Sequence, residues 1–156
     1  MKLYRSCHFI VACGGALAVF GLNGAEAQNG PAPCSLLTSA QVTAAVGVSV
    51  GAAQPIAGTG CSWSAPHMIV TLSLWDGSAS GWSKMKASIA GINKIPVSGL
   101  GDDAVMSTTG PAGGKQFVTL SVKKGNTAYL FKVYGPTASE QISMEKTLAG
   151  DVLAKL

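Results

Sequence analysis

The chain has 156 residues, of which 47% are hydrophobic and only 12% charged, and its formal net charge is +4. This length suits one domain with a core of its own, without metal ions to hold it together. The single arginine, Arg5, lies near the N-terminus. Proteins that bind nucleic acid usually rely on arginine, so we expect no nucleic-acid partner.

The N-terminus has the pattern of a secretory signal peptide. Lys2 and Arg5 precede an apolar run over residues 9–22, and the A-x-A sequence Ala25-Glu26-Ala27 follows. The pattern predicts a signal peptide over residues 1–27 that is cleaved after Ala27, and hence export to the periplasm or the medium. The apolar run is shorter than the roughly 20 residues of a membrane-spanning helix, so we expect no transmembrane span in the mature chain.

A lipid anchor is the alternative for the leader, because Ile10-Val11-Ala12-Cys13 looks like a lipobox. A lipobox cysteine follows the apolar stretch, whereas most of the stretch here follows Cys13. We therefore do not expect lipidation. Without residues 1–27 the chain keeps nine of its 11 basic and six of its seven acidic residues, a net charge of +3.

Two cysteines, Cys34 and Cys61, remain after the leader is removed. In an exported chain they most simply form one disulfide. A redox pair would favour C-x-x-C spacing, which is absent. Two cysteines and one histidine, His67, are too few for a four-ligand zinc site, so we expect no metal and no cofactor.

The mature chain starts with a flexible lead-in over residues 28–33, and residues 34–156 form one domain. Thr38 and Gln41 match a capping box. A short helix is expected from there to about Val46, with Gly47 as its C-terminal stop.

Two strands are predicted next, over residues 61–64 and 67–75, joined at Ala65-Pro66. The second is apolar on both faces, which places it centrally in a sheet. A helix over residues 79–90 follows, with Trp82, Met85 and Ile89 on one stripe.

The following stretch is predicted to be irregular around one strand. A loop covers residues 91–103, a strand covers residues 104–107, and residues 110–114 form a hairpin connection.

A hairpin is the clearest local structure, with strands over residues 117–124 and 127–134 around Gly125-Asn126. This turn pairs Lys124 with Thr127. The apolar pairs that follow from it all lie on one face. These pairs are Val122 with Tyr129, Leu120 with Phe131, and Val118 with Val133. The other face is mixed and carries Thr119, Ser121, Lys123 and Lys132, with Phe117, Leu130 and Tyr134 among them.

A terminal helix follows Pro136, with a capping box from Thr137 to Glu140. Its predicted apolar stripe should cover the hairpin and comprises Ile142, Ala149, Val152, Leu153 and Leu156. Glu145 falls within this stripe. We expect its carboxylate to reach solvent at the edge, and the alternative is a buried carboxylate with a raised pKa.

Two motifs resemble catalytic or nucleotide-binding patterns. Gly47-Val48-Ser49-Val50-Gly51 matches the nucleophile elbow G-x-S-x-G, but a helix precedes the serine where a strand is needed. Gly99 to Ala104 fits a dinucleotide pattern, but Asp102 and Asp103 would face the pyrophosphate. We interpret this second motif as a glycine-shaped loop with side-chain to backbone hydrogen bonds. We expect no catalytic residue.

Four aromatic residues are the candidates for a ligand-binding cleft: Trp63, Trp75, Trp82 and Tyr134. Tryptophans near strand and helix ends are otherwise core residues. The lone His67 has no visible partner for acid–base chemistry.

Together these elements predict an α+β fold, in which an antiparallel sheet packs against a short N-terminal, a middle and a C-terminal helix, with one disulfide. The order of the motifs around Cys34, Cys61 and the Gly99–Ala104 loop resembles a family of small exported bacterial domains of unknown function, many of them lipoproteins. The resemblance implies an α+β sandwich similar to PsbP-like domains, with the two cysteines bonded, and no catalytic residues.

The leading hypothesis is an exported, non-enzymatic domain that binds a protein or small ligand at the cell envelope. One alternative is a small hydrolase that uses Ser49 or Glu145. The other is an inhibitor or structural partner of an envelope enzyme.

Overall fold

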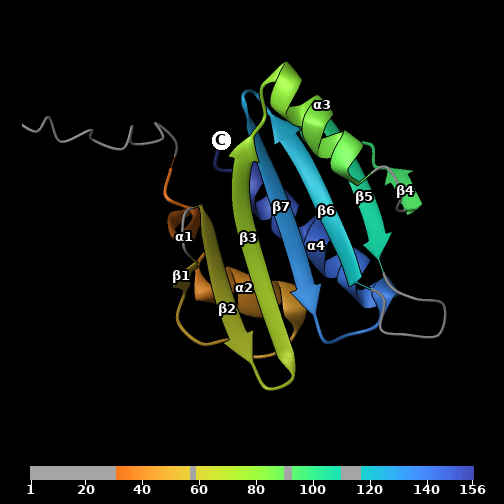
Figure 1. Ribbon diagram of the computed structural model, residues 1–156. Helices are drawn as coiled ribbons and strands as arrows, with labels where there is room; N and C mark the ends of the chain where they lie inside the picture. Colours follow the sequence, from red (N-terminus) through yellow and green to blue (C-terminus); the bar gives the residue numbers. More distant parts are fainter. Residues whose placement is uncertain (1–30, 57–58, 90–92, 110–116) are drawn as a thin grey trace, which may run out of the picture.

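The computed structural model describes residues 31–56, 59–89, 93–109 and 117–156 (Figure 1). The predicted signal peptide and the predicted connection over residues 110–114 lie outside these ranges. In chain order the elements are α1 (Pro33–Leu36), α2 (Ser39–Val46), β1 (Gln54–Ile56), β2 (Gly60–Ala65), β3 (Met68–Asp76), α3 (Ala79–Ser88), β4 (Asn93–Pro96), β5 (Asp103–Thr109), β6 (Phe117–Lys124), β7 (Thr127–Tyr134) and α4 (Ala138–Leu153).

The strands form one antiparallel sheet in the order β1-β2-β3-β7-β6-β5-β4. Helices α2 and α4 cover one face of it, together with the single turn of α1 (Figure 1). We call this the sealed face. Helix α3 lies on the opposite, open face and covers only part of it. The predicted α+β fold is confirmed, and the middle helix is on the other side of the sheet from its two companions.

The sealed face holds the main core. Strand residues that alternate toward α4 are almost fully buried, among them Leu72, Leu120 and Phe131. Because side chains alternate along a strand, the residues between them point to the open face. A smaller cluster under α3 contains Trp82, Met85, Val105 and Ala128.

The predicted start of the domain is confirmed in its main features. The Gln41 N–H donates to the Thr38 hydroxyl over 3.2 Å, the Thr38 N–H donates to Gln41 Oε1 over 3.1 Å, and Gly47 ends α2 with φ +72°. The disulfide between Cys34 and Cys61 is present and ties α1 to β2. The first helical turn begins at Pro33, inside the expected lead-in, because proline suits the first position of a helix.

The hairpin of β6 and β7 has the predicted bounds and turn, with Lys124 opposite Thr127 and Gly125 at φ +59°. The ladder stops after Leu120 and Phe131. Beyond that pair, the Val118 N–H donates to Gln141 Oε1 over 2.9 Å, and the Val133 N–H donates to Glu145 Oε1 over 3.0 Å. Two side chains of α4 thus replace the ladder bonds that Val118 and Val133 were predicted to share.

The expectation for Glu145 is wrong, because its side chain is fully buried. The buried row of α4 is Gln141, Glu145, Leu148, Ala149 and Val152, whereas Leu156 lies beyond the helix and is 51% exposed. The buried face of α4 is therefore rotated relative to the predicted apolar stripe, and it includes two polar residues. Those residues are inside because the separated strands offer them N–H groups to bind.

Two edge strands were not predicted. β1 contains Pro55, and β4 lies inside the predicted loop over residues 91–103. Both are three or four residues long and fully exposed, so they lack the alternation that marks a strand in sequence. Pro55 is tolerated because β1 is the edge of the sheet. Helix α3 ends at Ser88 rather than Ala90, and β5 is longer than the predicted residues 104–107.

Candidate ligand-binding face

The four candidate aromatic residues do not share one cleft. Trp63 is fully buried on the sealed face, and Trp82 is 4% exposed beneath α3. Trp75 is 56% exposed on the open face, and Tyr134 is half-buried on the same face. Trp75 and Tyr134 line a common hollow.

Strand register explains this separation. On β3, Val70, Leu72 and Leu74 point into the core. Trp75 follows Leu74 directly and therefore points to the open face. β3 pairs with β7 so that Ile69 faces Tyr134, Thr71 faces Lys132, Ser73 faces Leu130 and Trp75 faces Ala128. The open face therefore carries a polar row, Thr71 and Lys132, between more apolar neighbours.

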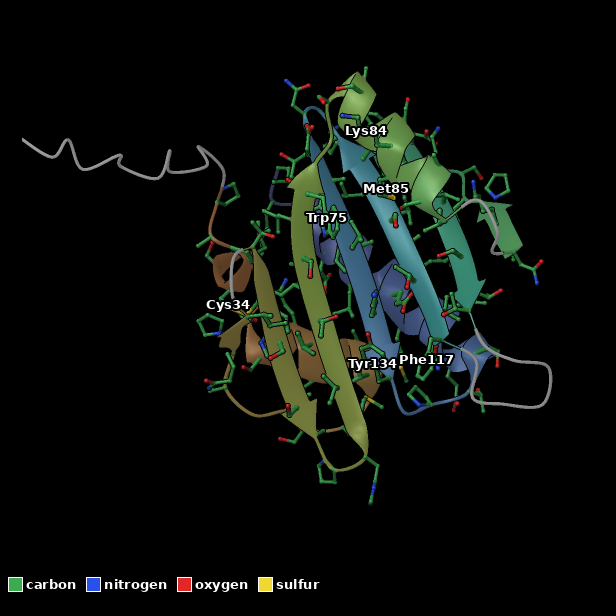
Figure 2. The ribbon with its side chains drawn as sticks, in the orientation of Figure 1. Cys34, Trp75, Lys84, Met85, Phe117 and Tyr134 are labelled. Carbon is green, nitrogen blue, oxygen red and sulfur yellow. A yellow bond between two sulfur atoms is a disulfide. The ribbon has the colours of Figure 1, made fainter. Side chains whose placement is uncertain are left out.

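A hollow of about 240 Å³ lies over these rows. Its lining combines apolar side chains with hydroxyl groups and one ammonium group: Ile56, Thr71, Ser73, Trp75, Leu130, Lys132 and Tyr134. We call it the lower hollow. At its Tyr134 end, the ring of Phe117 meets the ring of Tyr134 edge to face, with centroids 5.6 Å apart (Figure 2). Phe117 was not among the predicted site residues, although the hairpin register already placed it on this mixed face.

A second hollow of about 320 Å³ adjoins the first at Trp75 and runs along α3. Its lining residues are Trp75, Asp76, Gly81, Lys84, Met85 and Ser88. Figure 2 shows Trp75 on β3 between Met85 of α3 and Tyr134 near the other end of β7. We call this the upper hollow. Trp75 is thus the residue that the two hollows have in common.

Asp103 anchors α3, which forms one wall of the upper hollow. Its Oδ2 accepts hydrogen bonds from Trp82 Nε1 over 2.6 Å and from Lys86 Nζ over 2.9 Å. The bond from Lys86, followed by that from Trp82, holds the pKa of Asp103 below its usual value. At the start of α3, the Asp76 carboxylate accepts from the Ser78 N–H and hydroxyl, which lower its pKa. Both carboxylates of this end of the face therefore have partners.

Lys132 lines the lower hollow and belongs to β7, the middle strand of the sheet. In the described part of the chain its ammonium group makes no hydrogen bond and no ion pair. The ion pairs found there are Lys86 with Asp103 and Lys124 with Asp102. The hollow therefore presents a positive charge to solvent.

The residues considered for catalysis do not assemble a site. Ser49 lies in an exposed segment between α2 and β1, so the elbow lacks the strand before its serine. Glu145 is buried, and its carboxylate accepts from a backbone N–H of β7. His67 is exposed in the turn between β2 and β3, with φ +62°.

Burial raises the pKa of Glu145 to about 8. The N–H groups of Val133 and Leu120 and the charge of Lys132 act in the opposite direction, to a smaller extent. The carboxyl group is therefore protonated at neutral pH. Its Oε2 has no hydrogen-bond partner among the described residues, and neither has Trp63 Nε1.

The loop over residues 99–103 is a structural element, as its sequence indicated. Asp102 Oδ2 accepts the Gly125 N–H over 2.7 Å, and Gly99 and Gly101 have φ values of +81° and +60°. A Cβ atom on Gly101 would lie 2.3 Å from the Lys123 carbonyl oxygen. The glycines thus let this loop close against the hairpin turn, and the described residues contain no group of three His, Cys, Asp or Glu placed to hold a metal ion.

Within the described ranges, none of the helices has the length and apolar character needed to cross a lipid bilayer. Comparison with known protein families, with curated proteins and with solved structures finds no match to this chain. What the open face does must therefore be argued from its own residues.

Proposed function

We propose that the protein is an exported, non-enzymatic binding module that holds a small, largely apolar ligand on the open face. The observation that carries this proposal is the pair of adjoining hollows around Trp75. Binding sites for small molecules are typically concave, mainly apolar and equipped with a few polar groups.

The distribution of exposed apolar side chains supports this. Ile56, Ile69, Trp75 and Phe117 are each between 40% and 56% exposed. Ile69, Trp75 and Phe117 lie on the open side of the sheet, because each is next to a strand residue that faces the core. Ile56 lies on the same side because it pairs with Gly60, which in turn pairs with Ser73 of the open face. Large exposed apolar side chains that gather on one face of a domain mark an interaction site.

Export rests on two separate features. The leader over residues 1–27 has the pattern of a signal peptide, and the disulfide suits an oxidising compartment outside the cytoplasm. A ligand that the module meets there would be one of the small amphipathic molecules of the envelope or the medium.

Fluorescence titration with N-phenyl-1-naphthylamine, a neutral dye that brightens in apolar sites, tests the binding function. The purified protein should bind it with a micromolar dissociation constant. Trp75→Ala should weaken binding about tenfold, because central aromatic anchors carry much of the affinity of a site. Ile95→Ala is the matched control, since Ile95 is 50% exposed on β4 and lines neither hollow.

Dye binding that is absent from the wild-type protein, or unchanged in Trp75→Ala, would contradict the proposal. An equal loss in Ile95→Ala would also contradict it, because binding would then depend on exposed apolar area in general.

A further inference from the structure

Lys132 occupies an unusual position for a lysine. It lies in the middle of β7, the central strand of the sheet, and its side chain lines the lower hollow. Lysine is depleted in strands, which favour β-branched and aromatic residues. A structural reason for a cation here would be a carboxylate partner nearby.

No such partner is present on the described open face. Asp103 is bonded to Lys86 and Trp82, and Asp76 is bonded to Ser78. Glu145 of α4 is fully buried on the sealed side of the sheet, where its Oε1 accepts the Val133 N–H, so its carboxyl group does not reach the open face. The charge of Lys132 is therefore left for a group from outside the chain.

The neighbours of Lys132 would complete an anion site. Thr71 is its direct cross-strand partner, and Ser62 stands beside Thr71 on β2. The hydroxyl of Thr71 has no hydrogen-bond partner in the part of the chain that the structure covers, whereas the Ser62 hydroxyl donates to the Gln54 carbonyl oxygen over 3.4 Å. An ammonium group and a free hydroxyl group side by side can both donate to one anionic group.

Apolar side chains adjoin this polar pair. Leu130 precedes Lys132 by two residues on the same face, and Ile56 and Trp75 line the same hollow. An anionic head at Lys132 would leave the rest of a molecule over Leu130 and toward Trp75. Charge-assisted hydrogen bonds are roughly twice as strong as neutral ones, so the head group would orient the ligand.

We infer that the ligand of the open face is an anionic amphipath, whose carboxylate or sulfonate pairs with Lys132 and Thr71 while its apolar part lies against Leu130 and Trp75. This inference rests on the proposed binding function. It selects Lys132 over Lys84, the cation of the upper hollow, because Lys84 acts on the Asp76 carboxylate, which lines the same hollow. The carboxyl group on which Lys132 acts, that of Glu145, is buried on the opposite side of the sheet.

Two dyes that share one skeleton test the inference. N-phenyl-1-naphthylamine is neutral, and 1-anilinonaphthalene-8-sulfonate adds a sulfonate to the same rings. Lys132→Met should weaken binding of the sulfonate dye about tenfold and that of the neutral dye less than about twofold. Lys132→Arg should keep the affinity for the sulfonate dye within about threefold, because it keeps the charge.

Lys84→Met is the matched control and should leave both dyes within about twofold of wild type. Thermal unfolding of each variant checks that the fold is intact. Raising the NaCl concentration from 50 to 500 mM should weaken binding of the sulfonate dye alone, because salt screens the pairing with an exposed cation.

The two hypotheses fail in different ways. If neither dye binds, the proposed function is wrong. If both dyes bind but Lys132→Met weakens them equally or not at all, the binding function stands and the anionic head group is wrong.

Competition then identifies the type of anion. Displacement of the sulfonate dye by decanoate but not by decanol would indicate an acyl carboxylate. Displacement by 1-naphthoate but not by 1-naphthol would indicate an aryl carboxylate. If neither carboxylate displaces the dye, the carboxylate head group is contradicted and the sulfonate is the anion that Lys132 binds.

Discussion

The two faces of this sheet treat polar groups in opposite ways. On the sealed face, Gln141 and Glu145 are buried, and each accepts a hydrogen bond from a strand N–H. On the open face, Lys132 and Thr71 are only half-buried and have no described partner. Buried polar groups are usually hydrogen-bonded, and on the sealed face both helix side chains bind strand N–H groups, whereas Glu145 Oε2 and Trp63 Nε1 have no partner among the described residues. On the open face, the proposed function assigns the unpaired groups of the hollow to a ligand.

The two faces meet on one strand. Lys132 and Val133 are neighbours on β7, and the Val133 N–H binds Glu145 from the opposite side of the sheet. The separation of β6 and β7 beyond Leu120 makes this possible, because it frees the N–H groups that α4 then binds. The same stretch of strand therefore contributes to the core on one side and, in the proposed function, to ligand binding on the other.

The two tryptophans of β2 and β3 give the largest expected difference between the faces. Trp63→Ala should lower the free energy of unfolding by about 3–5 kcal/mol, because it leaves a cavity in the sealed core. Trp75→Ala should change it by less than about 0.5 kcal/mol, since Trp75 is 56% exposed. Urea unfolding followed by circular dichroism measures both.

Trp63→Phe sharpens this comparison. It should cost less than Trp63→Ala, because it keeps most of the volume and removes an indole N–H that has no described partner. If Trp63→Ala and Trp75→Ala lowered the free energy of unfolding equally, the open face would also contain a core that stabilises the fold.

The buried carboxyl group predicts a pH dependence of stability that comes from the sealed face. In the folded chain the pKa of Glu145 is about 8, whereas an unperturbed glutamate has a pKa of 4.5. The folded state therefore keeps a proton that the unfolded chain loses, and the contribution of Glu145 to stability falls as pH rises. This contribution is fully present below pH 4.5 and is lost as pH rises through 8, by roughly 3.5 kcal/mol between pH 5 and pH 8.

Glu145→Gln tests this, because the amide oxygen can still accept from the Val133 N–H but cannot ionise. The free energy of unfolding of each protein is measured in urea from pH 5 to pH 8.5. The value for wild type minus the value for the variant should decrease as pH rises. A difference that stays constant would mean that the carboxyl group remains ionised in the fold. Lys132→Met should raise the pKa of Glu145 further, since the Lys132 charge lowers it.

Much of the fold could be predicted from local chemistry. The Gly125-Asn126 turn determines the register of β6 and β7, and the capping residues Thr38 and Thr137 determine where α2 and α4 begin. The buried row of α4 could not be predicted in this way. Hydrophobic periodicity gives no weight to Gln141 and Glu145, whose burial depends on a separation of strands that no local pattern encodes.

The candidate site could be predicted in part. Alternation along β3 places Trp75 opposite in phase to Leu72 and Leu74, so its position on the open face was readable from the sequence. Lys132 was placed on the mixed face of the hairpin but carried no signal of its own. The proposal that Lys132 binds an anion depends on the nearby carboxylates already having hydrogen-bond partners. Only the assembled structure shows those partners.

Replacing Asp103, which anchors α3, gives the smallest expected effect on the free energy of unfolding. This prediction concerns the open face alone. Asp103→Asn should lower the free energy of unfolding by about 0.5 kcal/mol, because the ion pair with Lys86 is largely exposed and solvent screens it. Asp103→Ala should lower the free energy of unfolding by about 1–2 kcal/mol, since it also leaves the largely buried Trp82 Nε1 without an acceptor.

Trp82 fluorescence should shift to longer wavelength in Asp103→Ala, and binding of the neutral dye should weaken as α3 loses its anchor. If Asp103→Asn cost as much as Asp103→Ala, the lysine and not the indole would hold the helix, and the wall of the upper hollow would loosen in high salt.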